Sequence, residues 1–203
     1  MMKIIGICGG SGSGKTTLVE AVRAHLSSDF VSVISQDSYY KNHDTLTFEE
    51  RCKLNYDHPS AVDYDLFVSH LNQLKEGKSI HSPIYSYRDH LRSDQFLEIF
   101  PKPVVIVEGI LIFAHTPLKE QFTTTIFIDA KDDARLRRRI VRDIQTRGRT
   151  AEEVKHRFEN TILPMHSAHI QPHKETSDYI FDNNKDDLSR LGSFCKLVYK
   201  LIK

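Results

Sequence analysis

Short apolar runs alternate along most of the chain with segments in which apolar residues recur at helical spacing. Residues 3–8, 31–35, 104–107 and 125–128 are rich in β-branched residues and predict strands, and residues 179–181 are a candidate fifth strand. The runs are largely apolar throughout and do not alternate with polar residues, which is typical of strands buried on both faces. We therefore predict an α/β fold in which helices cover both faces of a parallel sheet.

Helical periodicity follows the first strand and returns several times further along the chain. Residues 16–22, 65–75, 132–146, 151–161 and 188–202 have this pattern, and in the last segment Leu191, Phe194 and Val198 would face inward. About seventy residues separate the second and third strands, which is too long for a simple loop. Within them, residues of about 80–100 suit a β-hairpin that we expect to bind substrate. The charged helices of about 131–162 suit a lid.

The composition describes an ordinary globular protein that forms one domain over residues 1–203. The chain is 39% hydrophobic and 27% charged, and we find no internal repeat or low-complexity linker. Cys8, Cys52 and Cys195 are too far apart for a disulfide framework, so we expect free, buried thiols in a reducing cytosol. No apolar run approaches the length of a signal peptide or a membrane span, so we expect a cytoplasmic protein without a membrane partner.

Positive charge is concentrated in one segment, although the net charge is only +1. Residues 131–149 contain eight Lys or Arg and three Asp or Glu, so this segment carries +5 and the remainder −4. The segment could be a solvated helix face, a nucleic-acid patch or an anion site. It has no aromatic residue to stack on bases, which argues against a nucleic-acid partner.

The first strand runs into a phosphate-binding motif that opens a helix. The sequence GGSGSGKT fits G-x-x-x-x-G-K-[ST] in the strand and helix context that the motif requires. Glycines let backbone N–H groups converge on phosphate oxygens, Lys15 would reach the β- and γ-phosphates, and the Thr16 hydroxyl would ligate Mg²⁺. The candidate nucleotide-binding residues here are Gly9, Gly10, Ser11, Gly12, Ser13, Gly14, Lys15, Thr16 and Thr17.

Two carboxylates are expected beside this loop, at the carboxyl ends of neighbouring strands. Glu108 follows the third strand and is the candidate second magnesium ligand, or else a carboxylate that caps the strand. Asp37 follows the second strand, where it could orient an acceptor hydroxyl and take its proton, or simply form a turn. A kinase needs such an acceptor site, whereas a switch or motor does not. Arg142, Arg147 and Arg149 are lid candidates that could neutralise transferring phosphate.

Six ordered motifs resemble the uridine/cytidine kinase family: GGSGSGKTT, SQDSYYK, NYDHPSAVDYD, PIYSYRDHLR, VEGILIF and RLRRRIVRDIQTRGR. The resemblance runs from Ile4 to about Asp186. It implies a P-loop kinase fold with a five-stranded parallel sheet, a β-hairpin and an arginine-rich lid. It also implies magnesium, ATP as phosphate donor with GTP left open, a pyrimidine ribonucleoside as acceptor in pyrimidine salvage, and a homotetramer.

The same resemblance assigns roles to individual positions of this chain. Asp37 would be the catalytic base, and Asp57 would bind the ribose hydroxyls. Tyr85 and His90 would contact the pyrimidine, which agrees with the stacking and hydrogen bonding that a small flat base needs. The remaining assignments are nucleoside contacts for Arg139, Arg149 and Arg157, phosphate contacts for Arg142 and Arg147, and a position near the adenine for Asp186.

The chain departs from the family pattern at two places. Arg157 stands where relatives tend to carry Gln, and residues 178–183 replace an apolar strand that usually ends in Pro. Rival readings are a kinase of another small alcohol, such as phosphoribulokinase or pantothenate kinase, a nucleotide-dependent switch or ATPase, and a zinc site on His166, His169 and His173. The choice between uridine and cytidine, the choice between ATP and GTP, feedback inhibition and subunit number stay open.

Overall fold

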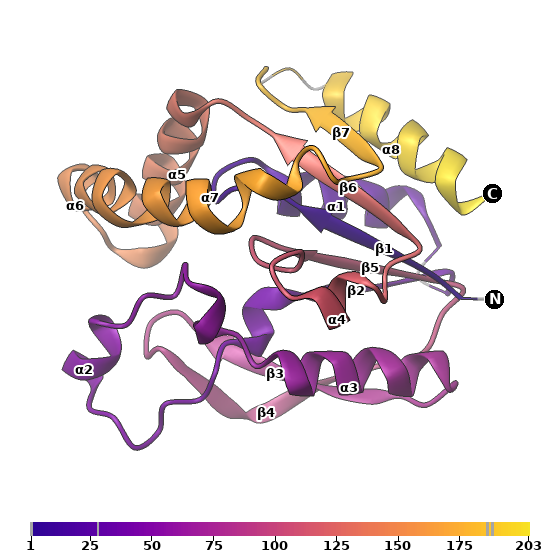
Figure 1. Cartoon of the computed structure of the whole chain (residues 1–203), viewed down its shortest axis with the longest axis horizontal. Helices are drawn as coiled ribbons and strands as arrows, with labels where there is room; N and C mark the ends of the chain where they lie inside the picture. Colours follow the sequence, from indigo (N-terminus) through magenta and orange to yellow (C-terminus); the bar gives the residue numbers. More distant parts are fainter. Residues whose placement is uncertain (1, 28, 186, 188) are drawn as a thin grey trace.

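A computed structural model of the protein describes residues 2–27, 29–185, 187 and 189–203 (Figure 1). Its central sheet has five parallel strands in the order β2-β5-β1-β6-β7. This arrangement confirms the predicted fold class and the fifth strand. The strands are β1 (Lys3–Cys8), β2 (Val31–Ser35), β5 (Val104–Gly109), β6 (Thr124–Asp129) and β7 (Tyr179–Asp182).

Helices cover both faces of the sheet because the central strands are apolar on both sides. On one face α1 (Lys15–His25) and α8 (Ser189–Ile202) pack on Ile5 and Ile7. On the other, α3 (Tyr64–Lys75) and α4 (Thr116–Lys119) pack with Ile4. Figure 1 shows α3 below the sheet and α8 above it. Burying both faces forms two hydrophobic clusters, one on each side of the strands.

The predicted hairpin is formed by β3 (Ile80–Ser86) and β4 (Leu91–Ile99), which pair antiparallel. Their register shifts between Pro83 and Tyr85. Proline has no backbone N–H to donate, so an interruption at this point is expected. Sequence reasoning did not find the short α2 (Phe48–Cys52), which begins at a capping box between Thr47 and Glu50.

The predicted lid, residues of about 131–162, contains α5 (Asp132–Arg147), α6 (Ala151–Arg157) and a π-helical turn (Phe158–Ile162), and α7 (Leu163–His169) follows it. The sequence predicted α5 almost to the residue but ended the next helix at residue 161. The π turn ends two residues before Pro164 in α7, whose missing N–H interrupts the regular hydrogen-bond ladder. The chain therefore stays helical from α6 into α7.

The three cysteines are free, as predicted, but only Cys8 is buried. Cys52 is exposed at the end of α2, and Cys195 is half-buried on α8, so the expectation of buried thiols was wrong for both. Among the described residues, every helix is too short or too polar to cross a bilayer.

The edge strand β7 is held at one end by a side chain and at the other by a backbone hydrogen bond. Before it, the Asp178 carboxylate accepts hydrogen bonds from the Thr125 N–H and hydroxyl, both at 2.7 Å. After it, the Asn183 N–H donates to the Asp129 carbonyl at 2.8 Å. The Asp178 side chain and the Asn183 backbone therefore hold β7 against β6.

We predict that Asp178→Ala lowers the free energy of unfolding by about 1–3 kcal/mol, because a charged acceptor is lost and the buried Thr125 is left with unpaired donors. Urea denaturation measures the change. Asp94→Ala, which removes an exposed carboxylate on β4, is the matched control and should shift stability by less than about 0.5 kcal/mol. Equal effects of the two substitutions would contradict the anchoring role of Asp178.

Candidate active site

The phosphate loop joins β1 to α1 and turns sharply at two glycines. Gly12 has φ +81° and Gly14 has φ +91°, values that favour glycine. A Cβ at Gly12 would lie 2.3 Å from the Arg135 carbonyl oxygen, and one at Gly14 would lie 2.5 Å from Asn183 Nδ2. Both positions therefore require glycine for conformation and for space.

Two side chains that sequence reasoning missed hold the back of this loop. Arg135, which is 1% exposed, donates from Nε to the Ser11 carbonyl at 3.2 Å. Asn183 donates from Nδ2 to the Ser13 carbonyl at 2.6 Å. Arg135 also pairs with Asp132 at 2.8 Å, so its buried charge has a counter-ion. The lid helix α5 and the edge strand β7 thus both brace the phosphate loop.

Lys15 lies across the loop at the first turn of α1. Its Nζ donates to the Gly9 carbonyl at 2.9 Å and to the Gly10 carbonyl at 3.3 Å. Burial lowers the pKa of Lys15, while the negative charge of Glu108 acts in the opposite direction. The ammonium group is nearly buried, so its charge is poorly screened by water.

Glu108 lies at the carboxyl end of β5, one residue before its last, and is almost fully buried. Its Oε1 accepts a hydrogen bond from the Ser35 hydroxyl at 2.8 Å. Burial and the nearby Asp37 carboxylate raise the pKa of Glu108. Glu108 and the Thr16 hydroxyl line the same cavity, and a carboxylate and a hydroxyl are hard oxygen donors that suit Mg²⁺. The residues present therefore fit the predicted metal.

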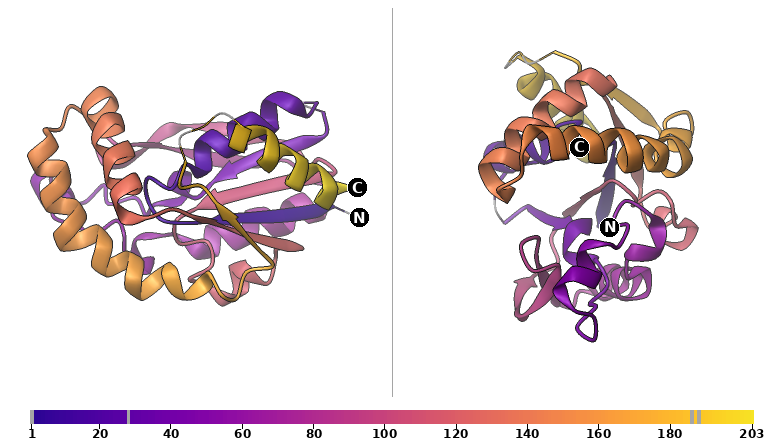
Figure 2. Two further views of the ribbon diagram at one scale, coloured as in Figure 1. Left: turned by 90° about the horizontal axis from the view of Figure 1, so that it is seen from above. Right: turned by 90° about the vertical axis from the view of Figure 1, so that its left-hand side faces the viewer.

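A cavity of about 360 Å³ extends from the phosphate loop to the hairpin. Figure 2 (right) shows the orange lid helices above this region and the purple and magenta α2 and hairpin segments below it. The cavity brings together most of the predicted site residues: Ser11, Gly12, Gly14, Lys15, Thr16, Thr17, Asp37, Asp57, Tyr85, His90, Glu108, Arg139, Arg142, Arg147, Arg149 and Arg157. Gly9, Gly10 and Ser13 are not among the residues that line it, and Asp186 lies outside the described residues.

Asp37 lies in a short 3₁₀ turn (Gln36–Tyr39) directly after β2. Its N–H donates to the Ser35 hydroxyl at 3.3 Å, which caps the turn. The preceding Gln36 is fully buried and accepts from the Leu111 N–H at 2.6 Å. The Tyr87 hydroxyl, at the hairpin tip, donates to Asp37 Oδ2. Asp37 is therefore held in the cavity wall with one oxygen engaged by a residue that sequence reasoning missed.

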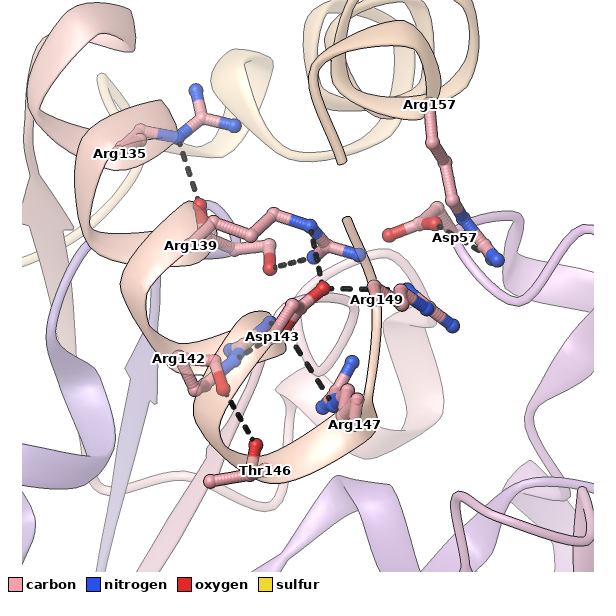
Figure 3. A network of polar contacts seen from close by, with 10 residues as sticks. Asp57, Arg135, Arg139, Arg142, Asp143, Thr146, Arg147, Arg149 and Arg157 are labelled. Carbon is pink, nitrogen blue, oxygen red and sulfur yellow. Dashed lines mark hydrogen bonds and ion pairs between the residues drawn. The ribbon is translucent and has the colours of Figure 1, made fainter. Parts of the chain in front are cut away.

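Asp57 lies on the lid-facing side of the same cavity and is 7% exposed. Its N–H donates to the Asn55 side chain at 3.1 Å. Arg157 approaches from the lid, with its Nη2 3.9 Å from Asp57 Oδ2 (Figure 3). This contact is at the outer limit of an ion pair, so the carboxylate retains capacity to accept hydrogen bonds from a ligand.

Aromatic rings form the wall next to Asp57. The His90 ring stacks on Tyr56 with centroids 4.9 Å apart and an angle of 15° between planes. The Tyr85 hydroxyl lies 3.4 Å from His90 Nδ1. Burial, together with the charge of Arg157, lowers the pKa of His90 and favours the neutral ring. Tyr40 also lines this wall, and neither it nor Tyr56 was predicted.

Arg51 holds the hairpin tip in place, although it does not line the cavity. It is buried, and its guanidinium donates to the carbonyls of Asp89, at 3.0 Å, and of Leu46. The next residue, His90, has φ +53°, which is unusual for a residue with a side chain. The contact from Arg51 thus supports the turn that aims His90 at the cavity.

Asp143 gathers the lid arginines and was also missed. Its side chain is fully buried, and its oxygens lie 2.8–3.6 Å from nitrogen atoms of Arg139, Arg142, Arg147 and Arg149 (Figure 3). Gly148, with φ +63°, ends α5 and turns Arg149 back toward this carboxylate. Burial alone would raise the pKa of Asp143, but the surrounding guanidinium groups lower it below its usual value.

The cluster around Asp143 carries a surplus of positive charge. One carboxylate faces four guanidinium groups, and all four arginines line the cavity. Arg139 is 4% exposed, and burial lowers its pKa to about 10. The lid therefore presents unneutralised charge to the cavity, an arrangement that attracts a polyanion such as a triphosphate.

The three histidines of the rival zinc site have different partners. The His166 Nε2 lies 3.0 Å from Gln171 Oε1, His169 packs edge-on against His58, and His173 lies near Phe113. Within residues 2–27, 29–185, 187 and 189–203, no group of three His, Cys, Asp or Glu is arranged to hold a metal ion.

We predict that Asp143→Asn lowers the free energy of unfolding by about 2–4 kcal/mol, because it leaves buried arginines without their counter-ion. Since the folded-state pKa of Asp143 is depressed, its stabilisation is complete above the unfolded value of roughly 3.9 and is lost as pH falls through the folded value. Urea titrations should therefore show a difference in the free energy of unfolding between wild type and variant at pH 7, and this difference should shrink below about pH 4. Asp133→Asn, at an exposed site on the same helix, is the control. A difference that is independent of pH would contradict this role.

Comparisons with known proteins agree with this geometry. Residues 4–189 match the model of the phosphoribulokinase/uridine kinase family. Over 177 residues, the chain is 44% identical to a uridine kinase of Clostridium novyi, covering 87% of this chain and 85% of that one. It is 46% identical to a uridine kinase of Macrococcus caseolyticus, covering 87% and 86%.

A solved structure of D-glycerate 3-kinase from Cryptococcus neoformans shares the fold, with a TM-score of 0.65 and 18% identity, and the match covers 90% of this chain and 86% of that one. The family match extends over both the phosphate loop and the hairpin, which form the two ends of the cavity. The chain belongs to the phosphoribulokinase/uridine kinase family.

Proposed function

We propose that the protein is an ATP-dependent uridine/cytidine kinase that transfers the γ-phosphate to the 5′-hydroxyl of a pyrimidine ribonucleoside. The observation that carries the proposal is the buried Asp57 beside the Tyr56, Tyr85 and His90 rings, in one cavity with Lys15 and Asp37. A flat base can stack on the rings while the ribose diol donates to the carboxylate. The relatives named uridine kinase support this choice over other small alcohols.

The phosphate end of the cavity binds the donor. Backbone N–H groups of the loop and the α1 N-terminus attract the phosphate oxygens, and Lys15 adds a nearly buried positive charge. Thr16 and Glu108 would hold magnesium, which when bound neutralises charge on the phosphates. The surplus charge of Arg142 and Arg147 stabilises the charge that develops on the transferring group.

Asp37 provides the general base at the junction of the two ends. Its carboxylate accepts a hydrogen bond from the 5′-hydroxyl and takes the proton as that oxygen attacks the γ-phosphorus. The bond from the γ-phosphorus to the bridging oxygen then breaks, and the two electrons leave with ADP. The capped turn that carries Asp37 limits its movement and so favours this alignment.

Asp57, His90 and the lid hold the nucleoside. Asp57 accepts from the ribose hydroxyls, and neutral His90 can exchange one hydrogen bond with the base edge. Arg139 and Arg149, which meet at Asp143, close the cavity from above, and Arg157 adds a donor next to Asp57. We also propose that the protein is cytosolic, acts in pyrimidine salvage and assembles as four copies, as the family resemblance implies.

A panel of acceptors in a coupled assay of ADP formation tests the proposal. Uridine and cytidine should support turnover with kcat/KM at least about 100-fold above ribulose 5-phosphate and pantothenate, because only nucleosides satisfy both Asp57 and the aromatic wall. In the same assay, Lys15→Met should lower kcat by ~10²–10³ without unfolding the protein. Preference for a non-nucleoside, or a variant that retains more than about a tenth of wild-type kcat, would contradict the account.

The sugar provides a second prediction. Removing the 2′-hydroxyl leaves the buried Asp57 partly unpaired, at a cost of roughly 1–3 kcal/mol, so 2′-deoxyuridine should fall at least about tenfold below uridine in kcat/KM. Asp57→Ala should strongly lower kcat/KM for uridine. It should also bring the ratio of kcat/KM for uridine to that for 2′-deoxyuridine toward one, because no carboxylate remains to accept from the 2′-hydroxyl. Asp94→Ala is the control. If Asp57→Ala leaves the ratio of kcat/KM for uridine and 2′-deoxyuridine unchanged, this carboxylate does not distinguish ribose from deoxyribose.

A further inference from the structure

The contact between Tyr87 and Asp37 has no role in the mechanism above. Tyr87 lies in the turn of the hairpin, 50 residues along the chain from Asp37, and its hydroxyl donates to Asp37 Oδ2. In the proposed function, this carboxylate is the group that holds the acceptor hydroxyl. A protein hydroxyl therefore already makes the hydrogen bond that the nucleoside hydroxyl has to make.

The ring of Tyr87 is held by a lid arginine. The Arg147 guanidinium lies 4.0 Å from the ring centroid, which is a cation–π distance. Arg147 is also one of the arginines that surround Asp143. Tyr85 packs edge-on against the same ring, with centroids 5.6 Å apart. Tyr87 is thus fixed from two sides, by the lid and by the hairpin.

The hydroxyl of Tyr87 is suited to donate and unsuited to react. Although Tyr87 is 36% exposed as a residue, loss of water around its hydroxyl and the neighbouring Asp37 carboxylate raise the pKa of Tyr87 well above its usual value, so the group stays protonated. A protonated phenol donates a good hydrogen bond to a carboxylate and is a poor nucleophile. In contrast, a water molecule on Asp37 could lose its proton and attack the γ-phosphorus.

A second hollow next to Tyr87 can receive its side chain when the hydroxyl leaves Asp37. This hollow of about 350 Å³ lies behind the tyrosine, against α1 and β2, and shares Asp37, Tyr87 and Glu108 with the main cavity. Its wall combines apolar residues, among them Val33, Pro83, Ile84 and Leu97, with the polar Thr16, Glu20, Ser35 and Ser38. The apolar part suits an aromatic ring. Tyr87 therefore borders both hollows, and the second gives its side chain space to move into when a nucleoside displaces it from Asp37.

We propose that Tyr87 is a placeholder for the acceptor: its hydroxyl occupies Asp37 until a nucleoside displaces it, and so excludes water from the attacking position. This inference rests on the proposed function and adds a regulatory contact to it. The reaction that is suppressed is hydrolysis, in which water oxygen bonds to the γ-phosphorus, its proton passes to Asp37, and the bond to ADP breaks. The products would be ADP and inorganic phosphate.

The test measures ADP released from ATP in the absence of nucleoside, and UMP formed in its presence. Tyr87→Phe keeps the ring over Arg147 but removes the hydroxyl, so we expect nucleoside-independent hydrolysis to rise by roughly tenfold, the value expected for losing one hydrogen bond to a charged group. In Tyr87→Leu, nucleoside-independent hydrolysis should rise at least as much. Adding Asp37→Asn to Tyr87→Phe should abolish the gain, because the base that activates water is gone. Tyr199→Phe, at an exposed site on α8, is the matched control.

Each outcome decides between two explanations. If the wild type forms no UMP, the proposed function fails and the placeholder role fails with it. If the wild type forms UMP but Tyr87→Phe hydrolyses ATP at the wild-type rate, only the placeholder role fails. A rise in Tyr87→Leu without a rise in Tyr87→Phe would show that the ring, and not its hydroxyl, excludes water, which also overturns the proposal. Thermal melts confirm that each variant is folded.

Discussion

The phosphate loop depends on close packing between its own backbone and two distant elements. Gly12 lies against the backbone of α5, and Gly14 lies against Asn183 at the end of β7. Because there is no room for a side chain at either glycine, the position of the loop is set by the lid helix and the edge strand together. Arg135 and Asn183 then satisfy loop carbonyls that would otherwise be buried without partners. Asn183 therefore serves the sheet through its backbone and the phosphate site through its side chain.

The same helix that braces the loop also carries the charges of the lid. Arg135 faces the loop at the start of α5, whereas Arg139, Asp143 and Arg147 follow at four-residue intervals and share one side of the helix. A single buried carboxylate holds the arginines together but does not neutralise them. The arginines of the lid are consequently held in place while they keep a net positive charge, and such preorganised charge favours phosphate binding.

Sequence reasoning succeeded where the signal is local and failed where it depends on packing. The five parallel strands were predictable because each is a short, largely apolar run. The positions of three candidate site residues were also predictable: Lys15 from the phosphate-loop motif, and Asp37 and Glu108 from the carboxyl ends of their strands. The inward-facing Arg135 could not be distinguished within a run of arginines, and Asp143 was counted only as one charge among many. The contacts of Tyr87 and Asn183 join positions 50 and 170 residues apart, which no local pattern encodes. Cys52 was expected to be buried from its residue type, but the unpredicted α2 exposes it.

In the proposed mechanism, one cavity aligns a nucleoside hydroxyl, held by Asp37, with a phosphate held at Lys15. A crystal structure with uridine and a non-hydrolysable ATP analogue tests it most directly. We expect the uridine 5′-oxygen within hydrogen-bond distance of Asp37, the ribose diol on Asp57, the γ-phosphate at Lys15, and the Tyr87 hydroxyl withdrawn from Asp37. A nucleoside bound elsewhere, or bound with its 5′-oxygen away from Asp37, would contradict the account.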